Sequence, residues 1–245
     1  MSSAMTEVVL AVLCGMPGER QALDNAIGGL PTVAIFSGKD RLALPTLVPP
    51  TVKLMVDAGL CGGIGPPLDV PAVVTATTLR HKSSIVPRNV WGPIQERMIF
   101  AVKAAGFTIH PVPYFSDGLF NESDNVAQRK TVYERYPERP QAMSDETRFA
   151  DALAIDRGIP LLVVRAISDS WYMNLPPAAC GAALNDDGSP NFAALFKSLG
   201  RDPEQIFGDG DPANPSLMDV ANFYHQSLAA LEATLRAIAP VLADI

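Results

Sequence analysis

Apolar residues recur along this chain in two patterns, continuous runs and runs with a helical repeat. Continuous or β-branched runs occupy residues 8–14, 32–36, 70–78, 107–115 and 160–167. Runs of this kind are typical of strands that are buried on both faces of a sheet, and such strands occur in parallel or mixed sheets covered by helices. The pattern therefore predicts a mixed central sheet at the centre of the molecule.

The second pattern predicts helices between these strands. The helical segments are 19–27, 93–105, 125–136, 145–157 and 216–238. Pro93 stands at a first helical turn, and Gly158 follows the last apolar position of its segment, as expected of a C-cap. Strands that alternate with helices indicate the α/β class. We expect an α/β fold in which helices flank a central mixed sheet.

The chain shows no internal repeat and no linker, so residues 1–245 are interpreted as a single domain. The segment 172–214 is different in composition, because it is rich in Pro, Gly, Asp and Asn and has one short helical pattern at 192–199. We interpret it as an insertion near the mouth of the active site.

Composition excludes several classes of protein. With 48% hydrophobic and 18% charged residues the chain can bury a core. A net charge of −7 without a basic stripe argues against nucleic-acid binding. No apolar run is long enough to span a membrane, and the start MSSAMTEVV lacks the basic segment of a signal peptide. We expect a cytoplasmic protein.

Cysteine and histidine content narrows the chemistry further. The three cysteines, Cys14, Cys61 and Cys180, are far apart and odd in number, which favours reduced thiols. The three histidines have no metal-ligand spacing, so neither a zinc enzyme nor a Ser-His-Asp hydrolase is indicated.

Three acidic residues lie where an α/β sheet binds ligands, near the carboxyl ends of strands. Glu19 follows the first strand, Asp169 ends the strand 160–167, and Glu146 begins the helix before that strand. Each also has a structural interpretation, because acidic residues are common at helix N-termini and in turns. The Gly-rich segment 59–65 is likewise most simply a turn, since it matches neither GxGxxG nor a P-loop. A dinucleotide-binding Rossmann domain is excluded for the same reason.

Together these segments resemble the nucleoside phosphorylase and nucleosidase superfamily. The most specific motif is VVRAISD at 163–169, which is similar to that of the methylthioadenosine/S-adenosylhomocysteine nucleosidases. In the same order along the chain, Gly15-Met-Pro-Gly-Glu19 resembles the family's Met-x-x-Glu loop, 59–64 its Gly-rich segment, and 116–121 the loop with a base-stacking Phe. The tail from Leu175 to Gly200 resembles the hopanoid-associated phosphorylases of the same superfamily.

The resemblance implies cleavage of the N-glycosidic bond of a purine nucleoside of the adenosine type. It implies that Asp169 protonates the leaving base, that Glu146 holds the ribose hydroxyls, and that Glu19 activates water. The other implied contacts are Met16, Phe120 and Ser168 for the substrate, and Ser37, Gly38, Gly62, Gly63 and Arg20 for the nucleophile or phosphate.

The sequence departs from the family in three places, one of which is a shorter hairpin between Glu19 and Ser37. The family's Glu-Met-Glu is here Ser144-Asp145-Glu146, and the Gly-rich segment lacks the Arg of the hexameric phosphorylases. The Met-x-x-Glu spacing and the missing Arg favour water as the nucleophile, whereas the tail favours phosphate, for which Arg20, Lys39 and Arg41 are candidate partners.

Three functions therefore stay open. They are hydrolysis, phosphorolysis to ribose 1-phosphate, and nucleoside binding without catalysis. Retention of all three acidic residues argues against the last of these. The resemblance implies no cofactor beyond phosphate as a possible co-substrate, and it implies a homo-oligomer.

Overall fold

The structure is a computed structural model that describes residues 7–116, 125–176, 203–207 and 210–245, together with residues 179, 197 and 200. Most of the predicted insertion at 172–214, its helix at 192–199 and Phe120 lie outside the described residues. The description of the fold below refers to the described residues.

Eight strands form one mixed sheet. The strands are β1 (Leu10–Leu13), β2 (Val33–Phe36), β3 (Leu54–Gly63), β4 (Val73–Arg80), β5 (Arg88–Asn89), β6 (Ile109–Phe115), β7 (Ala142–Met143) and β8 (Leu161–Asp169). β3 is the central strand of the sheet, because it pairs in parallel with β1 and β8 and antiparallel with β7. The pairings of β8 with β4, β4 with β6 and β6 with β7 close these strands into a ring.

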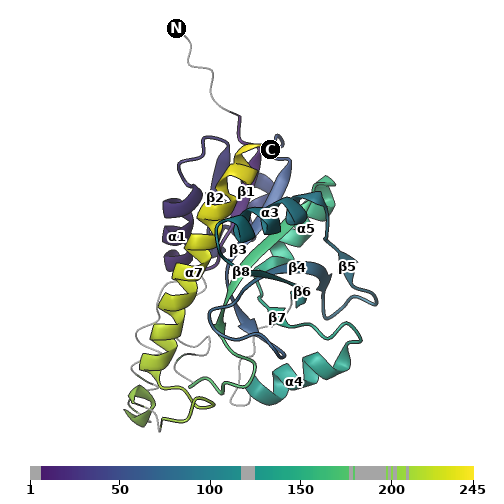
Figure 1. Cartoon of the computed structure of the whole chain (residues 1–245). Helices are drawn as coiled ribbons and strands as arrows, with labels where there is room; N and C mark the ends of the chain where they lie inside the picture. Colours follow the sequence, from purple (N-terminus) through teal and green to yellow (C-terminus); the bar gives the residue numbers. More distant parts are fainter. Residues whose placement is uncertain are drawn as a thin grey trace.

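Helices cover the sheet on both sides (Figure 1). On one side lie α1 (Pro17–Ile27), α3 (Pro93–Ala104) and the long α7 (Leu217–Ala243), and on the other α2 (Leu44–Leu47) and α5 (Thr147–Arg157). α4 (Asn125–Arg135) lies apart from these, at the bottom of the view. The α/β class and the flanked mixed sheet predicted from the sequence are confirmed.

Successive side chains of β3 point to opposite faces of the sheet, and each face is covered by one of these two helix layers. Leu54, Val56, Ala58 and Leu60 face the α1, α3 and α7 layer, whereas Met55 and Cys61 face α5. A strand covered on both faces has to be apolar at nearly every position, and this is why its sequence has no polar alternation. The ends of the helices follow local signals, as at Gly158, whose φ of +63° forms the left-handed C-cap of α5.

The sequence predicts no strand where β3 lies, and it ends the last helix at 238 rather than at Ala243. Residues 59–63 continue β3 and form no turn, because β7 and β8 pair with them along their length. α7 continues to Ala243 although Pro240 lies inside it, since Val241 and Leu242 in its last turn are buried in the core.

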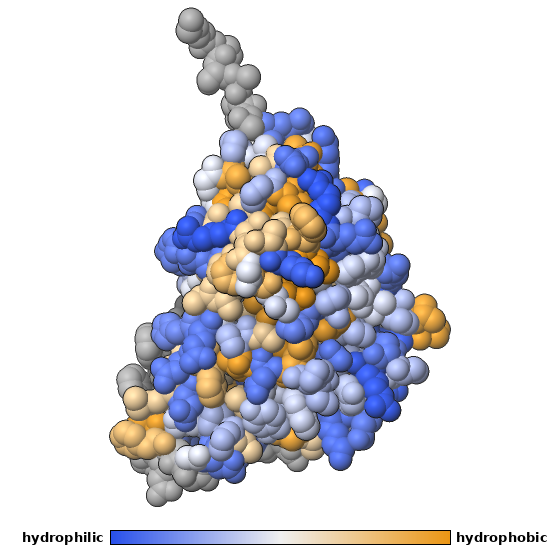
Figure 2. All heavy atoms as spheres, in the orientation of Figure 1, coloured by the Kyte–Doolittle hydropathy of each residue, from blue (hydrophilic) through white to orange (hydrophobic). Residues whose placement is uncertain are grey.

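The outward face of α7 is also apolar. Figure 2 shows pale apolar residues along the outward face of its upper half, flanked by polar groups of the neighbouring elements. Within the described residues, no helix combines the length and the apolar composition that a membrane crossing needs.

Candidate active site

A fully buried ion pair lies between the two central strands. Asp57 on β3 is registered opposite Val163 on β8, so Arg165 is its diagonal neighbour on the same face. Arg165 Nη2 donates to Asp57 Oδ1 at 2.5 Å and Nε donates to Oδ2 at 2.8 Å. Burial alone lowers the pKa of Arg165, but the Asp57 carboxylate outweighs it and holds this pKa well above the usual value. Arg165 is therefore a permanent cation inside the fold.

The same guanidinium reaches two further groups. Its Nη1 donates to the backbone oxygen of Leu60 at 2.6 Å and lies 3.5 Å from Glu146 Oε2. Asp57 is held in turn from α5, where Thr147 Oγ1 donates to Asp57 Oδ2 at 2.6 Å. One cation therefore connects the interior of the sheet to the N-terminus of α5.

Glu19 reaches this region from the first turn of α1. It is the third residue of the helix, and its carboxylate accepts the N–H groups of Gly15 and Met16 at 2.6 and 2.8 Å, one half of a capping box. The structural interpretation of Glu19 as a helix-terminal residue is thus confirmed. Its second oxygen accepts the N–H of Leu60 in β3 at 2.6 Å, a contact that capping does not require.

Burial raises the pKa of Glu19 to about 7. Arg165 and the backbone donors oppose the rise, and the negative charge of Glu146 adds to it. A carboxyl group with a pKa near neutrality is half ionised at physiological pH, which suits a general base.

Glu146 and Glu19 lie on the same side of Gly15. A Cβ atom on Gly15 would be 3.0 Å from Glu19 Oε2 and 3.0 Å from Glu146 Oε1, so only glycine leaves both carboxylates in place. Glu146 is the N-cap residue of α5, and 26% of its side chain is exposed. It is the more accessible of the two carboxylates.

The loop after β2 lies next to Gly15, beside the turn that carries Glu19. The N–H of Gly38 donates to the carbonyl of Gly15 at 3.1 Å, which brings Ser37 and Gly38 beside the Met16 and Glu19 turn. The Ser37 hydroxyl donates to Asp40. Arg20 is directed elsewhere, because its guanidinium donates to Asp24 and to the carbonyl of Ile35. Its position gives no support to a phosphate contact.

Asp169 stands at the other end of the site, at the last residue of β8. Ser168 Oγ donates to Asp169 Oδ1 at 2.8 Å, and Arg129 Nη2 donates to Oδ2. Only 14% of the Asp169 side chain is exposed. Asp169 is therefore held by two donors at the end of β8, a hydroxyl and a guanidinium.

Gly62 and Gly63 lie beside Asp169, at the same end of the site. A Cβ atom on Gly62 would lie 3.2 Å from Asp169 Oδ2, and the carbonyl of Gly63 accepts Arg129 Nη1 at 3.1 Å. β3 thus contacts Glu19 through Leu60 and Asp169 beside Gly62, two residues further on. The two contact points are about 7 Å apart along a strand.

Another polar row lies where β4 and β6 end. Ser116 Oγ is 2.8 Å from His81 Nδ1, and His81 Nε2 is 2.8 Å from Asp151 Oδ2, which also pairs with Arg88. Ser116 is fully buried, so its hydroxyl is not presented to solvent as a nucleophile. The row fixes the point from which residues 117–124 depart.

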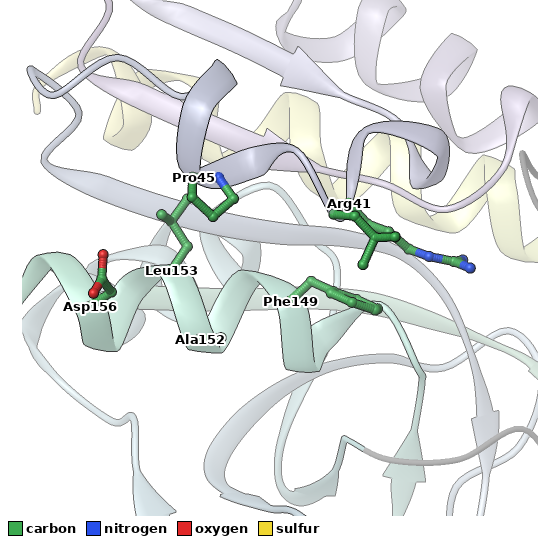
Figure 3. Close-up of a pocket in the computed structure, with 7 residues that line it drawn as sticks. Arg41, Pro45, Phe149, Ala152, Leu153 and Asp156 are labelled. Atoms are coloured by element: carbon green, nitrogen blue, oxygen red, sulfur yellow. The ribbon is translucent and has the colours of Figure 1, made fainter.

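A hollow of 290 Å³ lies between α5 and the segment 41–45 (Figure 3). It is lined by Arg41, Leu42, Pro45, Phe149, Ala152, Leu153 and Asp156. The guanidinium of Arg41 lies 5.5 Å from the centroid of the Phe149 ring. Arg41, a candidate phosphate partner in the sequence, thus contributes to this hollow.

The sequence interpretation assigned no role to three charged residues that the structure brings to the site, Asp57, Arg165 and Arg129. The signal for the first two was visible, because each is a charge within an otherwise apolar strand. Arg129 gave no such signal, since it lies on a helix that is polar throughout. Across the described residues, His, Cys, Asp and Glu side chains do not gather in groups of three or more that could hold a metal ion.

Comparison with known proteins agrees with this architecture at the level of the fold. No family model and no curated protein sequence matches the chain. Its structure is similar to that of futalosine hydrolase of Helicobacter pylori strain 26695, with a TM-score of 0.63, 11% identity and coverage of 96% of this chain and 98% of the other. The chain has the nucleosidase fold.

Two more structures with the nucleosidase fold are similar over nearly their whole length. The 5′-methylthioadenosine/S-adenosylhomocysteine nucleosidase of Neisseria meningitidis, in complex with methylthio-immucillin-A, has a TM-score of 0.62 at 14% identity and covers 95% of this chain and 99% of its own. The enzyme of the same name from S. pneumoniae has a TM-score of 0.58 at 13% identity, with 94% and 100% covered. The resemblance found in the sequence motifs is confirmed for the fold.

Proposed function

We propose that this protein is a nucleosidase that hydrolyses the N-glycosidic bond of a purine nucleoside. The observation that carries the proposal is the placement of Glu19 and Asp169 against β3, with contact points two residues apart. A strand rises about 3.3 Å per residue, so the two contact points lie about 7 Å apart and both carboxylates lie at the carboxyl end of β3. The nucleosidase fold of the chain supports the same reaction.

Each side chain has one role in the proposed reaction. Glu19 takes a proton from water as its oxygen adds to the sugar carbon that bears the base. Glu146 accepts hydrogen bonds from the ribose hydroxyls, and the bond between sugar and base breaks with its electrons passing to the base. Asp169 hands a proton to the departing purine. Between turnovers Glu19 releases its proton to solvent and Asp169 takes one up, so both groups return to their starting state.

Water is favoured over phosphate by the charges around Glu19. A phosphate dianion requires cationic partners, and Arg20 is turned toward Asp24 and Ile35. Arg165 is already shared by Asp57 and Glu146. The solved structures named above also bear the names of hydrolases and nucleosidases.

Product analysis tests the proposal. Adenosine, methylthioadenosine and inosine are incubated with the protein, each with and without phosphate, and the base and sugar products are separated. We expect free base and free sugar without phosphate. Turnover that requires phosphate and yields ribose 1-phosphate would replace hydrolysis by phosphorolysis, and binding without any cleavage would identify a nucleoside-binding protein.

The role of Glu19 is tested with Glu19→Gln and, as a matched control, the exposed Glu96→Gln on α3. A general base contributes on the order of 10²-fold or more, so Glu19→Gln should lower kcat by at least that factor. The control should keep the activity of the wild type. Equal activity of the two variants would contradict the assignment of Glu19.

A further inference from the structure

Arg129 lies on α4, and its side chain reaches the end of the site that contains Asp169. Only 4% of its side chain is exposed. Its Nη2 donates to the Asp169 carboxylate, and its Nη1 donates to the carbonyls of Gly63 and Ser170 at 3.1 and 2.7 Å. One guanidinium therefore joins the end of β3, the end of β8 and a carboxylate that the proposed reaction uses.

Stability alone explains this arrangement poorly. Removing a guanidinium and a carboxylate from water is costly, and a buried ion pair is often no more stable than apolar residues of the same size. Among the described residues, the buried Nε–H of Arg129 also has no hydrogen-bond acceptor, which adds to the cost. A costly arrangement that fixes one functional carboxylate points to a role in function.

The contacts also constrain Asp169 on every side. Its Oδ1 accepts Ser168, its Oδ2 accepts Arg129, and Gly62 leaves no room for a side chain next to Oδ2. The Asp169 carboxylate can rotate only if its hydrogen bond with the Arg129 guanidinium breaks. Through Arg129, α4 contributes a side chain to the end of the site that contains Asp169.

We propose that Arg129 is a positioning residue for Asp169: it fixes the orientation of this carboxylate where the leaving base binds. The inference rests on the proposed function. It assigns to α4, which carries none of the residues predicted from the sequence, a part in recognition of the purine.

A double-mutant cycle tests this role, with wild type, Arg129→Met, Asp169→Asn and the double variant. Binding of free adenine is measured by calorimetry, and hydrolysis of adenosine is measured by release of the base. A misplaced reacting group costs on the order of 10²-fold in turnover, so we expect a loss of that size for Arg129→Met. In the Asp169→Asn background, the same substitution should change binding and turnover by no more than about twofold, because its target is already gone.

Two further variants separate positioning from a structural role. Arg129→Lys keeps a cation for Asp169 and loses the forked contact with Gly63 and Ser170. It should therefore recover much of the turnover that Arg129→Met loses. Lys130→Met, on the exposed side of the same helix, is the matched control and should behave as the wild type. Losses of equal factor in both backgrounds, or no recovery with lysine, would overturn the inference and assign Arg129 to the backbone carbonyls alone.

The outcomes distinguish this inference from the proposed function. A wild-type protein that neither binds adenine nor cleaves nucleosides would overturn both. An active wild type in which the two substitutions act independently would overturn only the role of Arg129.

Discussion

Replacement of Glu19 by glutamine should change how the stability of the protein depends on pH. The pKa of Glu19 is raised by burial from its usual 4.5 to about 7 in the folded protein. The folded state therefore binds this proton more tightly than the unfolded state does. The resulting contribution to stability is fully present below about pH 4.5 and is lost as the pH rises through about 7.

The size of the effect follows from these two values. Between about pH 5.5 and about pH 8.5, the linkage relation gives a loss of about 2 kcal/mol in the free energy of unfolding from Glu19 alone. Glutamine does not ionise, so Glu19→Gln lacks this loss. Its amide also meets the N–H groups of Gly15, Met16 and Leu60 less well than a carboxylate does, but that cost does not depend on pH.

Urea unfolding followed by circular dichroism measures the effect at the two pH values. Wild type, Glu19→Gln and the control Glu96→Gln are compared, and the titrations of all other groups cancel in the differences. We expect the stability of Glu19→Gln relative to the wild type to rise by about 2 kcal/mol from the lower to the higher pH. The control should show no such change. A difference that stays constant within about 0.5 kcal/mol would refute the buried, proton-binding Glu19.

Two other substitutions test the packing of the site. Gly59→Ala would place a Cβ atom 2.7 Å from Glu19 Oε1, and because three N–H groups fix that carboxylate we expect a loss of about 1–3 kcal/mol in urea unfolding. Gly29→Ala has open space around its Cβ and serves as the control, so equal stability of the two variants would contradict this packing. Arg165→Met should cost about 3–5 kcal/mol because it leaves Asp57 buried without its cation, and a loss below about 1 kcal/mol would show that the pair is not buried as described.

Strands and helices were predictable where an apolar run or a helical repeat was long and uninterrupted. Continuous apolar runs predicted β1, β2, β4, β6 and β8, and the repeat with Gly158 as its C-cap predicted α5. β3, the longest strand of the described residues, was missed because its apolar positions pass into a Gly-rich segment. β5 and β7 contain two residues each and have no period that a sequence could show. Their pairing is decided by the strands on either side.

The Gly-rich end of β3 shows why local signals fail near the site. Glycines usually indicate a turn, yet Gly59 and Gly62 lie in a paired strand. The reason is the space they leave, since a side chain at Gly59 would meet Glu19 and one at Gly62 would meet Asp169. Both carboxylates come from segments remote from β3 in the sequence, so the need for glycine at these positions is visible only in the folded protein.

Partners of the predicted residues were harder to find than the residues themselves. Glu19, Glu146 and Asp169 were singled out because they follow or precede strands, and the structure places the first two at the same glycine. The guanidiniums that face them come from Arg165 in β8 and Arg129 in α4. Pairing across such distances in sequence depends on tertiary structure, which no spacing rule describes.

Burial explains why the pKa of Glu19 lies near neutrality. Removal of the Glu19 carboxyl group from water favours its protonated form, and the negative charge of Glu146 acts in the same direction. Arg165 and the backbone N–H groups that donate to Glu19 favour its ionised form and limit the rise. The Arg165 cation opposes burial only in part, because it also makes two hydrogen bonds with Asp57. A base that gains and loses its proton near neutral pH is thus a consequence of burial beside an arginine that Glu19 has to share.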